Sequence, residues 1–133
     1  MEKAIFDTSV WISYSRGIEN PQTLALEDYL KNFPKMVYIS PTIFQEFLMG
    51  LRNESDFIKY KFQLQSLNSF KSDWEKTSID AAKLYFDLRK KGITIRKSND
   101  CLIAQVAIEN DTLLIHLDSD FDLIAKNSVL RTF

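Results

Sequence analysis

Short apolar runs alternate along the chain with longer stretches in which apolar residues recur at helical spacing. The runs rich in β-branched and aromatic residues predict strands, which are expected at residues 3–7, 36–40, 112–118 and 129–133. A further extended stretch is expected around Trp74. Because helical stretches separate the strands, the pattern predicts right-handed crossovers and an α/β fold. We expect a mostly parallel sheet of about four to five strands, with helices on both faces.

Residues that cap helices mark where several of the helical stretches begin. The expected helices are residues 8–15, a stretch from Pro21, one opened by Ser40 and Pro41, one from Asn53 to about Phe70, one capped by Thr77 and Asp80 and ending at Gly92, one opened by Ser98, and residues 121–127.

The composition is that of a globular protein. With 133 residues, 45% of them hydrophobic, and only three Gly and three Pro, the chain is expected to form one domain over residues 1–133. No apolar run approaches the ~20 residues of a membrane span, and the acidic start MEKAIFDTSV is unlike a signal peptide. A single cysteine, Cys101, cannot form an internal disulfide, so we expect a cytoplasmic protein.

Four acids fall where a parallel sheet would bring them together. Asp7 and Asp118 each end a predicted strand, Asp100 lies in the first turn of a helix, and Glu46 lies in the middle of another. Ligands of open α/β sheets gather at the carboxyl ends of the strands, so these acids are expected to line one cleft. Taken singly, each has an ordinary explanation: a helix-terminus charge, a polar turn or an exposed helix face.

Carboxylates crowded into one cleft would repel each other, and a divalent cation would remove that conflict. Oxygen ligands favour Mg²⁺ or Mn²⁺ over Zn²⁺. The run HLDSDFD places Asp118, Asp120 and Asp122 at alternate positions, as in a calcium loop. That loop needs Gly at its sixth position and Glu at its twelfth, where this chain has Leu123 and Val129, so a calcium loop is excluded.

In order and spacing, these motifs resemble those of the PIN-domain ribonucleases, specifically the VapC-type toxins of bacterial toxin–antitoxin pairs. The resemblance spans nearly the whole chain and rests on IFDTS, on Ser40 with Glu46 and Gly50, on NDCLIAQVA, and on LIHLDSDFDLIA. It implies a PIN-like α/β/α sandwich and a Mg²⁺- or Mn²⁺-dependent endoribonuclease acting on structured RNA such as tRNA or ribosomal RNA. Asp7, Glu46, Asp100 and Asp118 would be catalytic metal ligands, with Asp120 in an auxiliary role. It also implies a homodimer that binds a VapB-type antitoxin.

The charge balance does not oppose an RNA substrate. The net charge is −1, but without the five candidate ligands 13 acids stand against 17 Lys and Arg. Four basic residues near the expected cleft could bind phosphates, although each could equally be an ordinary solvated charge: Arg16, Arg52, Arg96 and Lys97. We expect His116, the only histidine, to be a local packing or hydrogen-bonding residue and Asp122 to face solvent.

The chain also holds more large aromatic rings than one small core readily absorbs. An exposed apolar patch is therefore expected, and such patches usually mark interfaces. The rings concerned are Trp11, Tyr14, Phe57, Tyr60 and Phe62.

Two other functions stay open. A degenerate PIN module would bind RNA or protein without cutting it. A phosphate-accepting receiver domain would need paired acids after its first strand, where IFDTS offers only one. A histidine-pair ribonuclease is excluded, since the chain has a single histidine.

Overall fold

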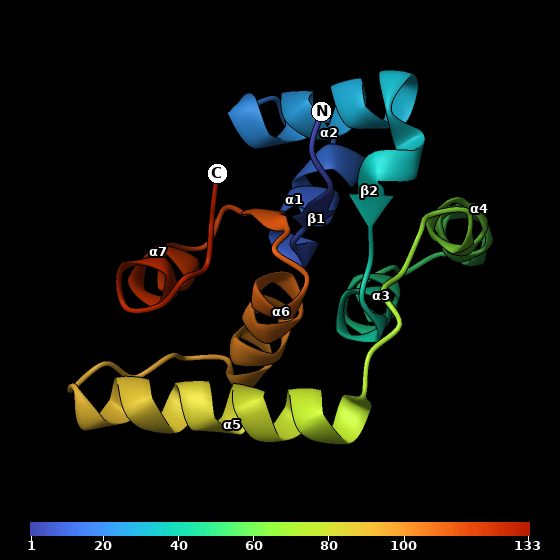
Figure 1. Ribbon diagram of the computed structural model, residues 1–133. Coiled ribbons are helices and arrows are strands. Elements are labelled where there is room, and N and C mark those ends of the chain that lie inside the picture. Colours follow the sequence, from blue (N-terminus) through green and yellow to red (C-terminus); the bar gives the residue numbers. More distant parts are fainter.

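The computed structural model describes residues 1–133 and has a parallel sheet at its centre (Figure 1). Its strands are β1 (Ala4–Phe6), β2 (Val37–Tyr38) and β3 (Leu113–Ile115), in the order β2-β1-β3. In the register, Ile5 of β1 lies opposite Tyr38 on one side and Leu114 on the other. All three residues of β1 are buried, as expected for the central strand of a sheet covered on both faces.

The sheet has fewer regular strands than the pattern predicted. The strand expected at 36–40 keeps two residues, because a 3₁₀ turn (Pro34–Met36) precedes it and Ser40 already caps the next helix. The strand expected at 129–133 is reduced to a bridge between Leu114 and Thr132. A second bridge joins Tyr38 to Asn68, so a short extended segment lies along each edge of the sheet.

Seven helices surround the sheet: α1 (Thr8–Ser15), α2 (Pro21–Asn32), α3 (Pro41–Met49), α4 (Glu54–Gln65), α5 (Trp74–Lys90), α6 (Ser98–Glu109) and α7 (Ser119–Lys126). The predicted caps Ser40 and Asn53 are confirmed, since each side chain accepts a hydrogen bond from a backbone N–H three residues on. The α/β sandwich with a parallel sheet is also confirmed. None of the helices is long and apolar enough to cross a membrane.

The predicted start of α5 and the predicted N-cap of α6 are wrong. Helix α5 begins at Trp74, where an extended stretch was expected, because Asp73 caps it by accepting from the Lys76 N–H at 3.1 Å. The Thr77 hydroxyl instead donates to Glu109 of α6 at 2.8 Å and so joins the two helices. Ser98 does not cap α6 either, because Lys97 holds the N-cap position without a side-chain hydrogen bond.

The expected end of α4 near Phe70 is also wrong. The helix stops at Gln65, and the chain then turns back along β2, where the Phe70 ring stacks on the Tyr38 ring with centroids 4.1 Å apart. This aromatic contact and the bridge at Asn68 remove residues 66–70 from the helix.

Helix α6 lies in the middle of the molecule, with α5 packed across it and α3 and α7 beside it (Figure 1). Half of its residues are buried, among them Asp100 and Cys101 in its first turn. The largest side chains of the core cluster, which has 25 residues, include Trp11, Phe6 and Phe47. This packing fixes the beginning of α6 against the carboxyl ends of the strands.

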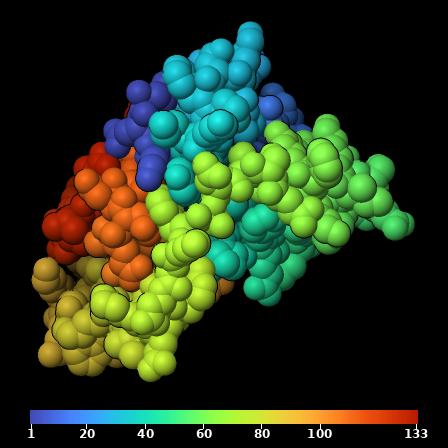
Figure 2. Space-filling model, turned by 45° about the vertical axis from the view of Figure 1, so that its right-hand side comes forward, coloured from blue at the N-terminus to red at the C-terminus, as the bar shows by residue number.

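The surplus of aromatic rings divides between core and surface. Trp11 and Tyr60 are buried, Tyr14 is half-buried, and Phe57 and Phe62 of α4 are 40% and 77% exposed. Helix α4 projects from the body of the molecule, as the green segment in Figure 2 shows. An exposed apolar patch is therefore present on α4, while the homodimer stays a prediction.

Candidate metal centre

Asp7 occupies the end of β1 and is the N-cap of α1. Its Oδ2 accepts from the Ser9 backbone N–H at 3.0 Å and from the Ser9 hydroxyl at 2.6 Å. The Ser9 oxygen in turn accepts from the Leu117 N–H at 3.1 Å, in the loop after β3. Ser9 therefore fixes the buried Asp7 carboxylate and ties β1 to the end of β3.

Asp118 and Asp120 lie at the start of α7 and share one partner. Asp118 is the N-cap, and its Oδ1 accepts from the Asp120 N–H at 3.0 Å and from Nη2 of Arg96 at 3.1 Å. Oδ2 of Asp120 accepts from the backbone N–H and Nε of Arg96 at 3.1 and 3.2 Å. Arg96 thus neutralises part of the charge of both carboxylates.

Asp100 is the unusual member of the group. Its side chain is buried, and Oδ2 has no hydrogen-bond partner. The pKa of Asp100 is raised to about 7, mainly by burial and further by Asp7, Asp118 and Glu46, while Lys97 acts in the opposite direction. The three carboxylates that act on it are the other predicted catalytic acids, so the electrostatic convergence expected from the sequence is present.

Glu46 reaches the same region from α3, where it is half-buried. Its Oε1 accepts from the Thr8 hydroxyl at 3.0 Å, and Thr8 directly follows Asp7 in the chain. The expected alternative, an exposed face pointing away from the other acids, is therefore wrong for Glu46.

The tightest group of acids is smaller than the predicted set. One carboxylate oxygen each from Asp100, Asp118 and Asp120 lies within 4.8 Å of the others. Asp7 and Glu46 fall outside this group but are close enough to raise the pKa of Asp100. A buried oxygen without a partner, surrounded by further carboxylates, fits the all-oxygen ligand set of a hard divalent cation.

The four predicted RNA-binding residues occupy different environments. The Arg96 side chain is 70% exposed, but its guanidinium is turned onto Asp118 and Asp120. Arg16, Arg52 and Lys97 are exposed and form no ion pair within the chain. Phosphate binding by these four residues stays a prediction.

The local role expected for His116 is confirmed. Its buried ring packs on Phe121 with centroids 5.2 Å apart, and Nδ1 accepts from the Asp118 N–H at 3.2 Å. The proton therefore lies on Nε2, which faces Asp122 Oδ1 at 3.4 Å. Asp122 is 59% exposed, as predicted. His116 thus orients the backbone at Asp118 and does not join the carboxylates.

Sequence reasoning missed the roles of Thr8, Ser9 and Arg96 in holding the acids. The two hydroxyl residues follow Asp7 directly, and that adjacency is a signal that could have identified them. Arg96 gave no comparable signal, because it lies more than 20 positions from the acids it contacts.

Comparison with known proteins identifies the family. The family model of the PIN domain matches residues 4–127. The chain belongs to the PIN-domain family. It is 30% identical over 127 residues to the VapC ribonuclease Mb1587 of Mycobacterium bovis and to ribonuclease VapC11 of Mycobacterium tuberculosis, with 96% of this chain and 95% of each relative covered. The receiver-domain alternative is thereby wrong.

Solved structures of similar fold support this placement of the PIN domain. VapBC2 from Rickettsia felis, bound to a DNA fragment from its promoter, matches with a TM-score of 0.73 at 21% identity, covering 98% of this chain and 96% of that one. VapBC from Salmonella typhimurium, also bound to DNA, matches with a TM-score of 0.73 at 16% identity, covering 100% and 98% of the two chains. At these identities the likeness concerns the fold of the PIN domain.

Proposed function

We propose that this protein is a metal-dependent endoribonuclease and the toxin of a type II toxin–antitoxin pair. The observation that carries the proposal is Oδ2 of Asp100, a buried carboxylate oxygen without a hydrogen-bond partner, among the other acids of the cleft. A carboxylate is kept in such a place at a cost in stability, and a cation would offset that cost. The names of the relatives, which are ribonucleases, favour RNA as the substrate.

The residues divide into candidate ligands and residues that hold them. Asp100, Asp118 and Asp120 would bind the cation, with Mg²⁺ or Mn²⁺ preferred by oxygen ligands. Asp7 and Glu46 would complete the group of acids around it. When bound, the cation lowers the pKa of water and offsets negative charge developing at phosphorus.

The chain's own groups would set the geometry of the attack. Ser9 holds the Asp7 carboxylate in one orientation, and Thr8 does the same for Glu46. Asp7 and Glu46, which lie outside the group of Asp100, Asp118 and Asp120, would accept a proton from the attacking water. The Arg96 guanidinium, 70% exposed at the mouth, would donate to a substrate phosphate when it leaves the carboxylates.

The proposed substrate is a structured RNA, with tRNA or ribosomal RNA as the candidates. The proposed partner is a VapB-type antitoxin in the cytoplasm, because the similar structures in the comparison include toxin–antitoxin complexes. Phe57 and Phe62 on α4 offer an exposed apolar surface for that partner or for a second copy of the chain.

The test is cleavage of total tRNA and ribosomal RNA by the purified protein with Mn²⁺, in parallel with excess EDTA. Asp100→Asn should remove cleavage. The matched control is Asp122→Asn, which makes the same chemical change on an exposed residue of α7 and should retain cleavage. Cleavage by Asp100→Asn at the wild-type rate, or cleavage that survives EDTA, would show that the mechanism is wrong. RNA binding without cleavage would favour the degenerate module.

A further inference from the structure

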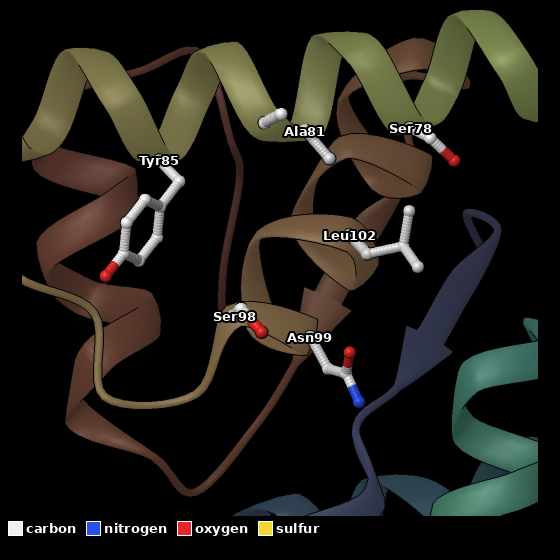
Figure 3. A pocket seen from close by; sticks show the side chains of 7 residues that line it. Ser78, Ala81, Tyr85, Ser98, Asn99 and Leu102 are labelled. Atoms are coloured by element: carbon white, nitrogen blue, oxygen red, sulfur yellow. The ribbon is translucent and has the colours of Figure 1, made fainter.

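A cavity of about 330 Å³ lies between α5 and α6 (Figure 3), and none of the candidate metal ligands lines it. This volume is at the lower end of the ~300–1,000 Å³ typical of small-molecule sites. Three apolar side chains form part of the lining: Ala81, Ala82 and Leu102. The main polar groups are Tyr85 of α5 and, in the first turn of α6, Ser98 and Asn99.

The polar side chains of the cavity form no hydrogen bonds within the chain, and two of them, Ser98 and Asn99, are exposed to solvent. The chain has seven asparagines, and six of them form side-chain hydrogen bonds within it: Asn20, Asn32, Asn53, Asn68, Asn110 and Asn127. Asn99 forms none, and neither do the hydroxyls of Tyr85 and Ser98. Its free amide, with one acceptor and two donors, directly precedes Asp100 in the sequence. The cavity therefore offers unused hydrogen-bonding groups one residue from the candidate metal ligand.

Aromatic rings and cations lie next to each other near the end of α5. The Arg89 guanidinium carbon lies 5.6 Å from the Tyr85 ring centroid and 5.8 Å from that of Phe86. Nζ of Lys90 lies 4.8 Å from the Phe86 ring. Aromatic rings next to cations suit single-stranded nucleic acids, because every base has a π-face and every nucleotide has a phosphate.

A basic segment joins the cavity to the acids. Residues 89–97 hold five cations and no acid, and they run from the end of α5 to the start of α6. Arg89, Lys90, Lys91 and Lys97 make no ion pair, whereas the fifth, Arg96, contacts Asp118 and Asp120. Earlier in α5 the lysines are neutralised, since Lys76 pairs with Asp80 and Lys83 with Asp87. The free positive charge thus begins beside the cavity and ends at the candidate metal centre.

We propose that the cavity between α5 and α6 is a subsite for one unpaired nucleobase of the RNA, which stacks on Tyr85 and hydrogen-bonds to Asn99. The 89–97 segment holds the phosphates on either side and leads the backbone to the carboxylates. This inference rests on the proposed function and narrows its substrate to RNA with an unpaired nucleotide next to the cleaved bond. An amide pairs best with the edge of adenine, so oligoadenylate should bind more tightly than oligouridylate.

The observations favour RNA over a protein partner at this cavity. An apolar peptide would leave the Asn99 amide and four unpaired cations unused, and an acidic peptide would not need the ring of Tyr85. A nucleotide uses the ring, the amide and the cations together.

The test measures binding of short fluorescent oligoribonucleotides to the full-length protein in EDTA, where cleavage is absent. Tyr85→Ala and Asn99→Ala should each weaken binding of oligoadenylate about tenfold, which is the order expected for one stacked base. Tyr85→Phe keeps the ring and should bind within about twofold of wild type. Asn32→Ala, on exposed α2, is the control for loss of an asparagine and should leave binding unchanged. Circular dichroism checks the fold of each variant, and Asn99→Ala tests the subsite if Tyr85→Ala fails to fold.

A fully paired RNA duplex provides the second arm, because it has no free base to place in the cavity. Its affinity should be the same for wild type and Asn99→Ala. The subsite would be overturned if Tyr85→Ala and Asn99→Ala bind oligoadenylate with wild-type affinity. It would also be overturned if these variants change the sedimentation of the protein but not its RNA binding, because the cavity would then be a contact between protein copies. Absence of cleavage with intact base binding would instead overturn the proposed function alone.

Discussion

Asp100 and Asp120 are equally buried, at 4% and 5% exposure, yet their surroundings are opposite. Oδ2 of Asp120 accepts two hydrogen bonds from Arg96, whereas Oδ2 of Asp100 accepts none. Burial, with neighbouring carboxylates, raises the pKa of Asp100 to about 7. The Asp120 carboxylate is therefore hydrogen-bonded within the protein, whereas Oδ2 of Asp100 is left free to bind a ligand.

The contrast shows which acids depend on a cation. A buried carboxylate paired with an arginine contributes to the native structure whether or not a metal is bound. An unpaired one destabilises the metal-free protein and gains most from binding, because a ligand that binds only the native state stabilises it. We therefore expect Asp100 to control activity and Asp120 to control the shape of the site.

The largest expected effect concerns cleavage. Asp100→Asn should lower the rate of RNA hydrolysis with Mn²⁺ by more than about 100-fold, because it removes a candidate ligand. Asp120→Asn should lower it less, since the amide oxygen can still accept from Arg96. Single-turnover cleavage measures both, and equal losses would remove the distinction between the two residues.

The next effect is the pH dependence of stability without metal. The pKa of Asp100 is about 7 in the folded protein and near 3.8 when the side chain is free, so the folded state holds the proton more tightly. The free energy of unfolding should therefore fall as pH rises from about 4 to about 7, by about 2 kcal/mol after allowance for relaxation.

Urea unfolding in EDTA at several pH values measures this dependence. Asp100→Asn should flatten the curve and be more stable than wild type at pH about 8, while Asp122→Asn should follow wild type. A wild-type curve that rises through the same interval would mean that Asp100 is not the group responsible.

Arg96 pairs with Asp120 but not with Asp100, so removing its charge should affect the metal-free protein through Asp120. Arg96→Gln should lower the midpoint of thermal unfolding in EDTA by several degrees, because it leaves the buried Asp120 carboxylate without its charged partner. Added Mn²⁺ should narrow the difference, since the cation can replace the guanidinium. Lys97→Gln, at the neighbouring exposed position, should change the midpoint little. An equal loss in both variants would indicate a general charge effect.

The smallest expected effect concerns the hydrogen bond between Thr8 and Glu46. Thr8→Val removes the hydroxyl that donates to Glu46 Oε1 at 3.0 Å and should weaken Mn²⁺ binding a few-fold, with the fold unchanged. Isothermal titration with Mn²⁺ measures the affinity, and Thr8→Ser should restore it. If Thr8→Ser does not restore the Mn²⁺ affinity, the loss in Thr8→Val comes from changed packing and not from the missing hydroxyl.

The sequence alone determined the features that depend on neighbouring residues. Asp7 directly follows a run of buried residues, and Ser40 and Asn53 cap helices through backbone groups three positions away. Such contacts involve only neighbouring residues, so a local pattern can predict them, although the same reasoning failed for Thr77 and Ser98. The alternation of elements likewise predicted the parallel sheet, and through it the gathering of the acids at one edge.

The tertiary structure determined the burial and the hydrogen-bond partners of each of those acids. Arg96 reaches Asp118 and Asp120 across more than 20 positions, and Asp100 is buried without a partner for Oδ2 in the first turn of α6, which packs against α5 and α7. The same packing opened the cavity beside Asn99 and reduced the C-terminal strand to one bridge. The burial and the pairing of a side chain depend on which segments, distant in the sequence, pack against it. This is a property of the whole folded chain and cannot be predicted from a short stretch of sequence.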